Sequence, residues 1–350
     1  MKTKIVKINS ENIDEDLISE AASLIKEGKL VAFPTETVYG LGANGLDEEA
    51  VIKIFEAKGR PQDNPLILHI ESIDQLMPLV EYVPEIAYQC IERFWPGPLT
   101  MIFKRSSLVP DVISGGLDTV AIRMPENKIA RELIRWSKVP IAAPSANLSG
   151  KPSPTAAHHV IRDLLGRVDM IIDGGSTGVG LESTVLDLSG DIPMVLRPGG
   201  ITIEDLKEII PNVTQDLGTI KESEDIVPKS PGQKYRHYAP LAEMRVYTGD
   251  VEDIVKAINL ACHELKIQGR KIGIMATVET KDRYNLGIIV KVVGTREQKE
   301  TIAANLFDVI RQFDDEDVDI ILAEGVETDQ IGMAIMNRMM KASGGKIIQV

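Results

Sequence analysis

The sequence predicts an α/β protein of two domains. Between residues 1 and 210, segments with the spacing of amphipathic helices alternate with short apolar segments of strand length. From residue 241 onward a second series of strands and helices begins, in a β-α-β-α order. Residues 211–240 lie between them and contain four prolines, several charges and no sustained periodicity. We therefore expect domains at 1–210 and 241–350, joined by a linker at 211–240.

The first domain is predicted to begin with a helix between Asp14 and Gly28. Apolar residues such as Leu17, Ile18 and Ala21 recur on one face of this segment, and Gly28 is a typical helix stop. Asp47 can cap the next helix, which runs through residue 57 and ends at KGRP. The same reasoning predicts helices at 84–94 and 127–137, and strands at 30–40, 64–70, 119–124, 140–145, 169–175, 183–188 and 193–199.

The second domain is predicted to be a small parallel sheet between two layers of helices. The β-α-β-α order of its strands and helices is typical of such a sheet. We expect strands at 243–249, 271–276, 288–294, 318–325 and 346–350, and helices at 251–267, 296–313 and 332–341.

Composition excludes several classes of protein. The formal net charge of −13 argues against a general nucleic-acid coat, so any contact with a polyanion would need a local basic cleft. No apolar stretch approaches the length of about 18–20 residues that crosses a bilayer, and the start of the chain is charged. Cys90 and Cys262 are far apart and in no metal-ligand spacing. These features favour a cytoplasmic protein without a disulfide framework.

Residues 40–45, GLGANG, match the G-x-G-x-x-G fingerprint of dinucleotide-binding proteins. The match is weak, because the preceding strand contains Pro34, Thr35, Glu36 and Thr37, where a buried parallel strand should be apolar. The acidic residue expected about 20 positions later falls in a turn. We interpret these glycines as permitting a tight bend.

Polar and basic residues recur at the ends of the predicted strands and helices. Short hydroxyl and amide donors together with arginines suit a small anionic ligand, since arginine can hold a carboxylate or a phosphate with two parallel hydrogen bonds. Taken singly, each of these residues could instead have a local structural role. The set comprises Thr35, Lys58, Arg60, Asn64, His69, Thr119, Arg123, Ser145, Asn147, Ser183 and Arg197.

At these residues the chain resembles the threonylcarbamoyl-AMP synthase family, the YrdC-like proteins, in its long two-domain form. KYRHYAP (234–240) and GMAIMNRMMKAS (332–343) resemble the linker and the last helix of that form. The other matching stretches are FPTETVYGLG (33–42), KGRP (58–61), NPL (64–66), WPGPLT (95–100), GLDTVAIRMP (116–125), PIAAPSANLSG and PSPT (140–155), DGG (173–175), ESTV (182–185) and LRPG (196–199).

The resemblance implies an open, twisted, mixed sheet with helices in the first domain and a small Rossmann-like second domain. It implies a nucleotidyltransferase that converts L-threonine, bicarbonate and ATP into threonylcarbamoyl-adenylate and pyrophosphate. The product would pass to a tRNA threonylcarbamoyl transferase, which modifies tRNAs that read codons beginning with A. The fold's concave face would also allow a contact with double-stranded RNA or tRNA.

The family's motifs carry over residue by residue. Lys58 and Arg60 would act electrostatically, with no covalent nucleophile, and Mg²⁺ would be bound through ATP rather than by a protein metal site. The resemblance implies that L-threonine contacts Thr35, His69, Arg123, Ala143 and Ser183. It implies that ATP contacts Lys58, Arg60, Asn64, Thr119, Ser145, Asn147, Ser153, Arg197 and Tyr235.

Three alternatives remain open on the sequence. One is a carbamoyl-transferring relative, although two cysteines cannot form the zinc-finger modules that accompany it. Another is a pure RNA-binding module, and the third is a dinucleotide-dependent oxidoreductase. We also expect the basic and aromatic stretch at 234–238 to fold over the ATP site as a lid, because residues 211–240 are too long for a plain connection. The alternative is that these aromatic residues only pack at the interface between the domains.

Overall fold

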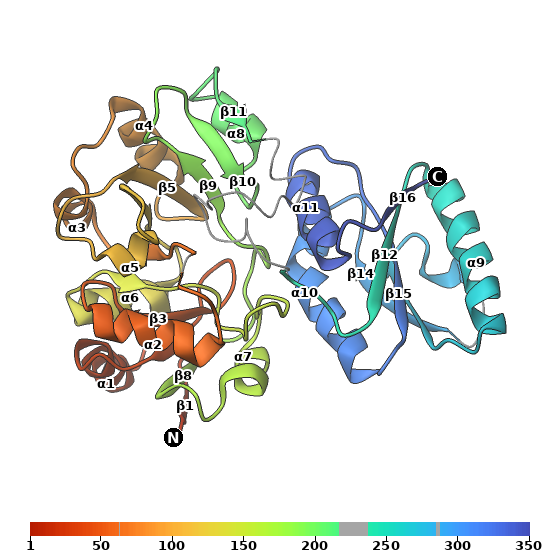
Figure 1. The fold of residues 1–350 in the computed structure, drawn as a ribbon, viewed down its shortest axis with the longest axis horizontal. Helices are drawn as coiled ribbons and strands as arrows, with labels where there is room; N and C mark the ends of the chain where they lie inside the picture. Colours follow the sequence, from red (N-terminus) through yellow and green to blue (C-terminus); the bar gives the residue numbers. More distant parts are fainter. Residues whose placement is uncertain (63, 217–236, 285–287) are drawn as a thin grey trace. The chain divides into compact units, whose positions relative to one another are not determined.

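The computed structural model describes residues 1–62, 64–216, 237–284 and 288–350. The chain forms two compact units (Figure 1). Unit 1 comprises Met1–Ser149 and Ser153–Tyr235, and unit 2 comprises Gly150–Pro152 and Arg236–Val350. The predicted lid at 234–238 falls largely outside the described residues, and so does Tyr235.

Unit 1 is built on a mixed sheet that contains eleven strands in the described part of the chain. Their order across the sheet is β1-β8-β2-β3-β7-β4-β6-β5-β9-β10-β11. The strands are β1 (Lys4–Lys7), β2 (Val31–Phe33), β3 (Gly40–Asn44), β4 (Ile67–His69), β5 (Leu99–Lys104), β6 (Thr119–Arg123), β7 (Ile141–Ala142), β8 (Met170–Asp173), β9 (Thr184–Asp187), β10 (Met194–Arg197) and β11 (Thr214–Gln215). The predicted strand pair at 183–188 and 193–199 is confirmed as antiparallel β9 and β10, and β11 continues this sheet beyond residue 210.

The first two helices of unit 1 begin after aspartates that cap them. Asp14 accepts a hydrogen bond from the Leu17 amide at 3.1 Å, and Asp47 accepts one from the Ala50 amide at 3.2 Å. Gly59 ends its helix in a left-handed conformation, with φ of 60°. The helices are α1 (Glu15–Lys26), α2 (Glu48–Lys58), α3 (Ile73–Leu76), α4 (Glu85–Phe94), α5 (Asp111–Ser114), α6 (Lys128–Ser137), α7 (Ala157–Leu164) and α8 (Ile203–Lys207), with a 3₁₀ turn η1 (Met77–Leu79).

Alternation along the strands divides the core of unit 1 between the two faces of the sheet. On β2, Val31 and Phe33 pack in one apolar cluster with residues of α1 and α6, whereas Ala32 packs in another with residues of α2. The face of β4, β6, β5 and β9 opposite to this second cluster carries a small apolar group: Ile67, Ile102, Ala121, Val185 and Leu196. Polar side chains surround this small group, and the candidate site lies there.

Residues Gly40–Asn44 form strand β3, which pairs antiparallel with β2, and Gly45 lies in the turn that follows. A dinucleotide fingerprint would place its glycines in the turn between strand and helix, whereas Gly40 and Gly42 lie within the strand. The interpretation as a tight bend therefore holds for Gly45 and is wrong for Gly40 and Gly42. A Cβ at Gly42 would lie 2.8 Å from the Phe33 ring and 2.9 Å from Ile141. Glycine is therefore required at this strand position by close packing.

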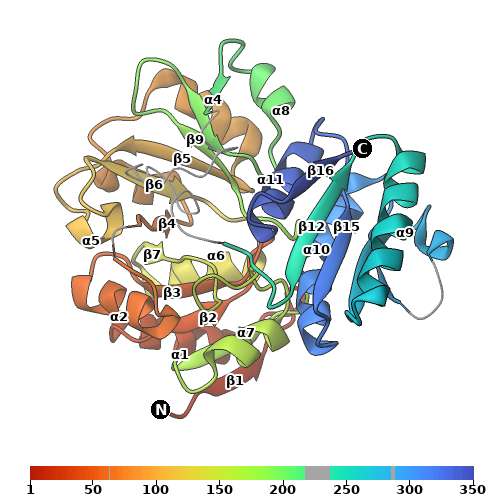
Figure 2. The ribbon, with the colours of Figure 1, turned by 45° about the vertical axis from the view of Figure 1, so that its right-hand side comes forward.

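Unit 2 is a parallel five-stranded sheet in its described residues, with the order β14-β13-β15-β12-β16. Helix α9 covers one face, and α10 and α11 cover the other (Figure 2). The elements are β12 (Glu243–Thr248), α9 (Val251–Ile267), β13 (Ile272–Thr277), a 3₁₀ turn η3 (Lys281–Arg283), β14 (Ile289–Gly294), α10 (Lys299–Asp315), β15 (Ile320–Glu324), α11 (Gly332–Ala342) and β16 (Ile347–Gln349). The predicted α/β fold of both units is thus confirmed.

Helix α10 begins three residues later than predicted, at Lys299 instead of Arg296. The Arg296 side chain explains the delay, because it donates to the Gly325 carbonyl at 2.8 Å and holds this segment against the end of β15. Within the described parts of both units, no helix combines the length and apolar character needed to cross a membrane.

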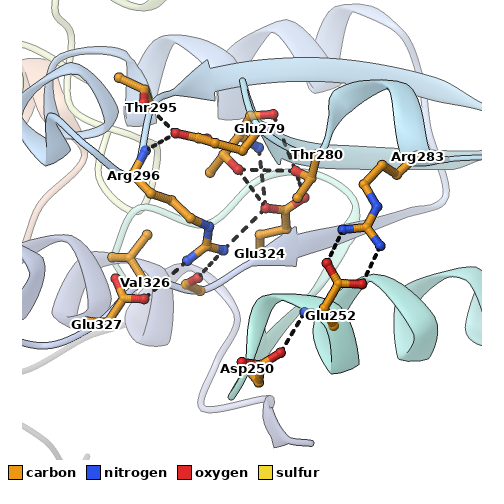
Figure 3. Close-up of polar contacts among 12 residues, drawn as sticks. Asp250, Glu252, Glu279, Thr280, Arg283, Thr295, Arg296, Glu324, Val326 and Glu327 are labelled. Carbon is orange, nitrogen blue, oxygen red and sulfur yellow. Dashed lines mark hydrogen bonds and ion pairs between the residues drawn. The ribbon is translucent and has the colours of Figure 1, made fainter.

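A cluster of buried polar side chains lies at the carboxyl ends of β13 and β15 in unit 2 (Figure 3). Glu324, at the end of β15, is fully buried and accepts hydrogen bonds from Thr277, Thr280 and Tyr284. Glu324 Oε2, the oxygen that accepts from Thr277, also lies 3.3 Å from Arg296 Nη2. β13 and β15 are neighbours in the sheet, but the chain continues from β13 to β14 on one side and from β15 to β16 on the other. The carboxyl ends of β13 and β15 therefore form a topological switch point, where open α/β sheets commonly bind ligands. Here the protein's own side chains occupy it.

Replacing Glu324 with glutamine should therefore destabilise unit 2 locally. The amide would face hydroxyl donors with an NH₂ group and leave Arg296 without its buried counter-charge, at a cost of about 3 kcal/mol. We expect backbone amides of β13 and β15 to exchange with solvent about 100-fold faster in Glu324→Gln, measured by hydrogen exchange. Glu297→Gln, at an exposed position nearby, is the control. Unchanged exchange in Glu324→Gln would contradict the role assigned to the cluster.

Candidate functional site

Adjacent strands of the unit 1 sheet bring together predicted site residues that are far apart in the sequence. His69 at the end of β4 is paired with Arg123 at the end of β6, and Arg123 is also paired with Thr100 on β5. After β7, the Ala143 amide donates to the Ile67 carbonyl of β4 at 3.0 Å. The hydrogen-bonding register of the sheet thus places these residues in one row.

Arg123 is 4% exposed and lies in a buried polar corner. Its Nε donates to the Gly97 carbonyl at 3.2 Å, Nη1 to Thr37 Oγ1 at 2.9 Å, and Nη2 to Glu36 Oε1 at 2.5 Å. Thr37 in turn lies 2.8 Å from Thr35, hydroxyl to hydroxyl. The guanidinium is therefore fixed in orientation before any ligand arrives.

Glu36 is the carboxylate partner of Arg123. Burial alone would raise the pKa of Glu36, but the charge and hydrogen bond of Arg123 outweigh it, so the pKa is lower than usual for glutamate. Glu36 consequently stays ionised at neutral pH. The motif PTET suggested hydroxyl and carboxylate donors here, but sequence reasoning assigned no role to Glu36 or Thr37.

His69 contributes a neutral imidazole to the same corner. It is 3% exposed and meets the edge of the Phe33 ring, with ring centroids 6.4 Å apart. Burial first, and the charge of Arg123 second, lower the pKa of His69 to about 3. Its Nδ1 is buried and has no hydrogen-bond partner among the described residues. This nitrogen is available to a bound ligand.

Ser183, just before β9, is also held in place. Its hydroxyl lies 2.7 Å from that of Thr100, and Arg197 donates to both its hydroxyl and its carbonyl at 3.1 Å. Thr100 is a second residue that sequence reasoning missed. The available signal was a single polar residue at an alternate position of the apolar strand LTMIF.

Lys58 is the last residue of α2 and Arg60 follows this helix. The two residues form a second group with the residues after β7. The Lys58 ammonium donates to the carbonyls of Ser145 and Asn147, the latter at 2.7 Å. Burial, followed by repulsion from Arg60, lowers the pKa of Lys58 well below its ordinary value. An ammonium has three N–H donors, so two carbonyl contacts leave one for a ligand.

The side chain of Asn64 indicates that this second group binds a ligand. It is fully buried, and neither its amide oxygen nor its amide nitrogen has a partner among the described residues. Arg60 donates to the Asn64 carbonyl at 3.3 Å, which ties the two residues together. An unsatisfied buried amide costs about 1–3 kcal/mol, and a hydrogen-bonding ligand would recover this cost.

The remaining predicted ATP residues are less tightly grouped. Ser153 donates to Glu182 at 2.5 Å and so is engaged within the protein. Thr119 begins β6 and Arg123 ends it, so about 13 Å of strand separates them. Tyr235 lies outside the described residues. The structure therefore brings the threonine set together more completely than the ATP set.

Comparison with known proteins matches both units. Residues 23–199 match the Sua5, YciO and YrdC family model, whose description is "Telomere recombination". Residues 201–344 match the model described as "Threonylcarbamoyl-AMP synthase, C-terminal domain".

Relatives named threonylcarbamoyl-AMP synthase match along the whole chain. The protein of Pyrococcus abyssi is 51% identical over 97% of this chain and 98% of its own length. That of Bacillus subtilis is 50% identical over 100% of both chains. The crystal structure of P. abyssi Sua5 complexed with L-threonine is 50% identical and superposes with a TM-score of 0.95 over 99% of this chain and 100% of the other. With both units matched in this way, the chain belongs to the threonylcarbamoyl-AMP synthase family.

Proposed function

We propose that this protein condenses L-threonine, bicarbonate and ATP into threonylcarbamoyl-adenylate and pyrophosphate. The threonine amine and bicarbonate form a carbamate and water, and a carbamate oxygen then attacks the α-phosphorus of ATP, releasing pyrophosphate. The observation that carries this proposal is the buried corner around Arg123. It offers a fixed cation and an anion, beside buried hydroxyl groups, to a small polar molecule.

L-threonine fits that corner. A guanidinium has five N–H donors, and Arg123 uses three of them on described residues, which leaves two for a substrate carboxylate. The hydroxyls of Thr35 and Ser183 are held in position by hydrogen bonds with Val38 and Arg197. His69 supplies an uncharged nitrogen. The crystal structure of the P. abyssi relative complexed with L-threonine supports threonine as the ligand, and its position at this corner is our proposal.

ATP phosphates fit the group at Lys58 and Arg60. These cations, with the open amide of Asn64, suit the negative charge of phosphates. Residues 143–147 connect the two groups, since Ala143 contacts β4 and the carbonyls of Ser145 and Asn147 hold Lys58. The reaction thus needs positioning and charge neutralisation, without a covalent nucleophile.

Mg²⁺ would bind through the ATP phosphates. The site carboxylates Glu36 and Glu182 are engaged with Arg123 and Ser153, which agrees with a metal held mainly by the nucleotide. We also propose that the protein works in the cytoplasm and passes its product to a tRNA threonylcarbamoyl transferase. Contact with tRNA itself stays a prediction, because a net charge of −13 gives no general attraction for a polyanion.

Product analysis tests the proposed function directly. The protein is incubated with ATP, L-threonine and ¹³C-bicarbonate, and the mixture is analysed by mass spectrometry. We expect labelled threonylcarbamoyl-adenylate and an equal amount of pyrophosphate, and neither when threonine is omitted. Pyrophosphate release that does not depend on threonine would contradict the proposal, and a pure RNA-binding module would release none.

Arg123→Lys tests the assignment of the carboxylate site. Lysine keeps a positive charge opposite Glu36, but its single ammonium cannot replace the planar guanidinium that contacts Glu36, Thr37 and Gly97. We expect L-threonine to bind about 10- to 100-fold more weakly, from a lost charge-assisted contact of about 1.5–3 kcal/mol. ATP binding should change less than about twofold, which isothermal titration calorimetry would measure for both ligands.

Arg105→Lys is the matched control, since Arg105 pairs with the exposed Asp111 at the surface of the same unit. It should retain the affinities of the unmodified protein. Loss of ATP binding with intact threonine binding in Arg123→Lys would show that the two ligand sites are reversed.

A further inference from the structure

We propose that Glu36 makes the corner around Arg123 selective for an amino acid in its zwitterionic form, with the carboxylate on Arg123 and the ammonium beside Glu36. Glu36 would thus be a specificity-determining residue that distinguishes L-threonine from a hydroxy acid of the same shape. This inference rests on the proposed function, because it takes L-threonine as the molecule that this corner binds.

The positions of the two charges support the proposal. The Glu36 side chain is 12% exposed and that of Arg123 is 4% exposed, so both are largely removed from water. One carboxylate oxygen of Glu36 contacts Arg123, and the other accepts a long hydrogen bond of 3.4 Å from the Asn127 amide. The backbone amides of Glu36 and Glu126 also stabilise the ionised carboxylate. A carboxylate has about four acceptor positions, so this second oxygen can accept a further donor such as an ammonium group.

The charge balance of the corner explains why Arg123 and Glu36 would select a zwitterion over a simple carboxylate. Arg123 and Glu36 together are neutral, and His69 adds no charge because its pKa lies at about 3. A ligand with only a carboxylate would gain Arg123 but would meet the like charge of Glu36 in a poorly solvated site. A zwitterion matches both charges at once. The corner should therefore reject simple carboxylates that Arg123 alone would accept.

The lowered pKa of Glu36 argues against a role as the general base. Its pKa is lowered despite burial, because Arg123 outweighs desolvation, so it is a weak base. Glu36 therefore binds the ammonium form and orients the nitrogen. It does not remove the proton that the amine must lose before it attacks bicarbonate.

Calorimetry with two ligands tests this inference. The first ligand is L-threonine, and the second is 3-hydroxybutyrate, which is threonine without its amine. The unmodified full chain should bind L-threonine at least about 30-fold more tightly. In Glu36→Gln, threonine binding should weaken about 10- to 30-fold, whereas 3-hydroxybutyrate should bind as well as before or more tightly. Glu36→Asp, which keeps the charge, should recover at least part of the selectivity. Glu126→Gln, at an exposed position nearby, should keep all of it.

Several outcomes would contradict the proposed role of Glu36. Equal weakening of both ligands in Glu36→Gln would show that Glu36 only anchors Arg123, and unchanged threonine binding would also overturn the inference. If Glu36→Gln does not fold, equal affinity of the unmodified protein for both ligands would still refute it, and a preference retained by Glu36→Asp would support it. Selective threonine binding without threonylcarbamoyl-adenylate production would refute the proposed function alone. Production of that adenylate without the selectivity would refute this inference alone.

Discussion

The hydrogen-bonding register of five central strands is the constraint on which the candidate site depends. The unit 1 sheet contains these strands side by side in the order β7, β4, β6, β5 and β9. In the sheet β6 lies between β4 and β5, whereas in the sequence it follows both. The pairing of His69 with Arg123, and of Arg123 with Thr100, follows from this order. Because a shift of one residue reverses every side chain to the opposite face, the register also decides which residues line the site.

Buried charge is the second determinant of the site. Removing Arg123 and Glu36 from water costs several kcal/mol, and their mutual attraction offsets this only with good geometry. Lys58 is buried, with its ammonium on two carbonyls. Burial, and then repulsion from Arg60, lower its pKa. Such arrangements are costly for stability, but they hold charged groups in fixed positions for polar substrates. An arriving phosphate would favour the charged form of Lys58.

Local features of the fold were predictable from the sequence. Asp14 and Asp47 cap the predicted helices because capping depends on neighbouring residues in the chain. The parallel sheet of unit 2 was predictable from the β-α-β-α order of its elements. The role of residues 40–45 was not, since the close approach of Phe33 and Ile141 to Gly42 exists only in the folded sheet. The predicted site residues came chiefly from the family resemblance, whereas the pairing of Glu36 with Arg123 depends on contacts 87 positions apart.

A crystal structure of this protein with L-threonine and a non-hydrolysable ATP analogue would test the account most directly. The account predicts that the threonine carboxylate lies on Arg123 with its nitrogen toward Glu36. The phosphates would lie at Lys58 and Arg60, with the α-phosphate on the side of the threonine nitrogen. A threonine carboxylate bound at Lys58 or Arg60, or phosphates bound at Arg123, would contradict the assignment of the two groups.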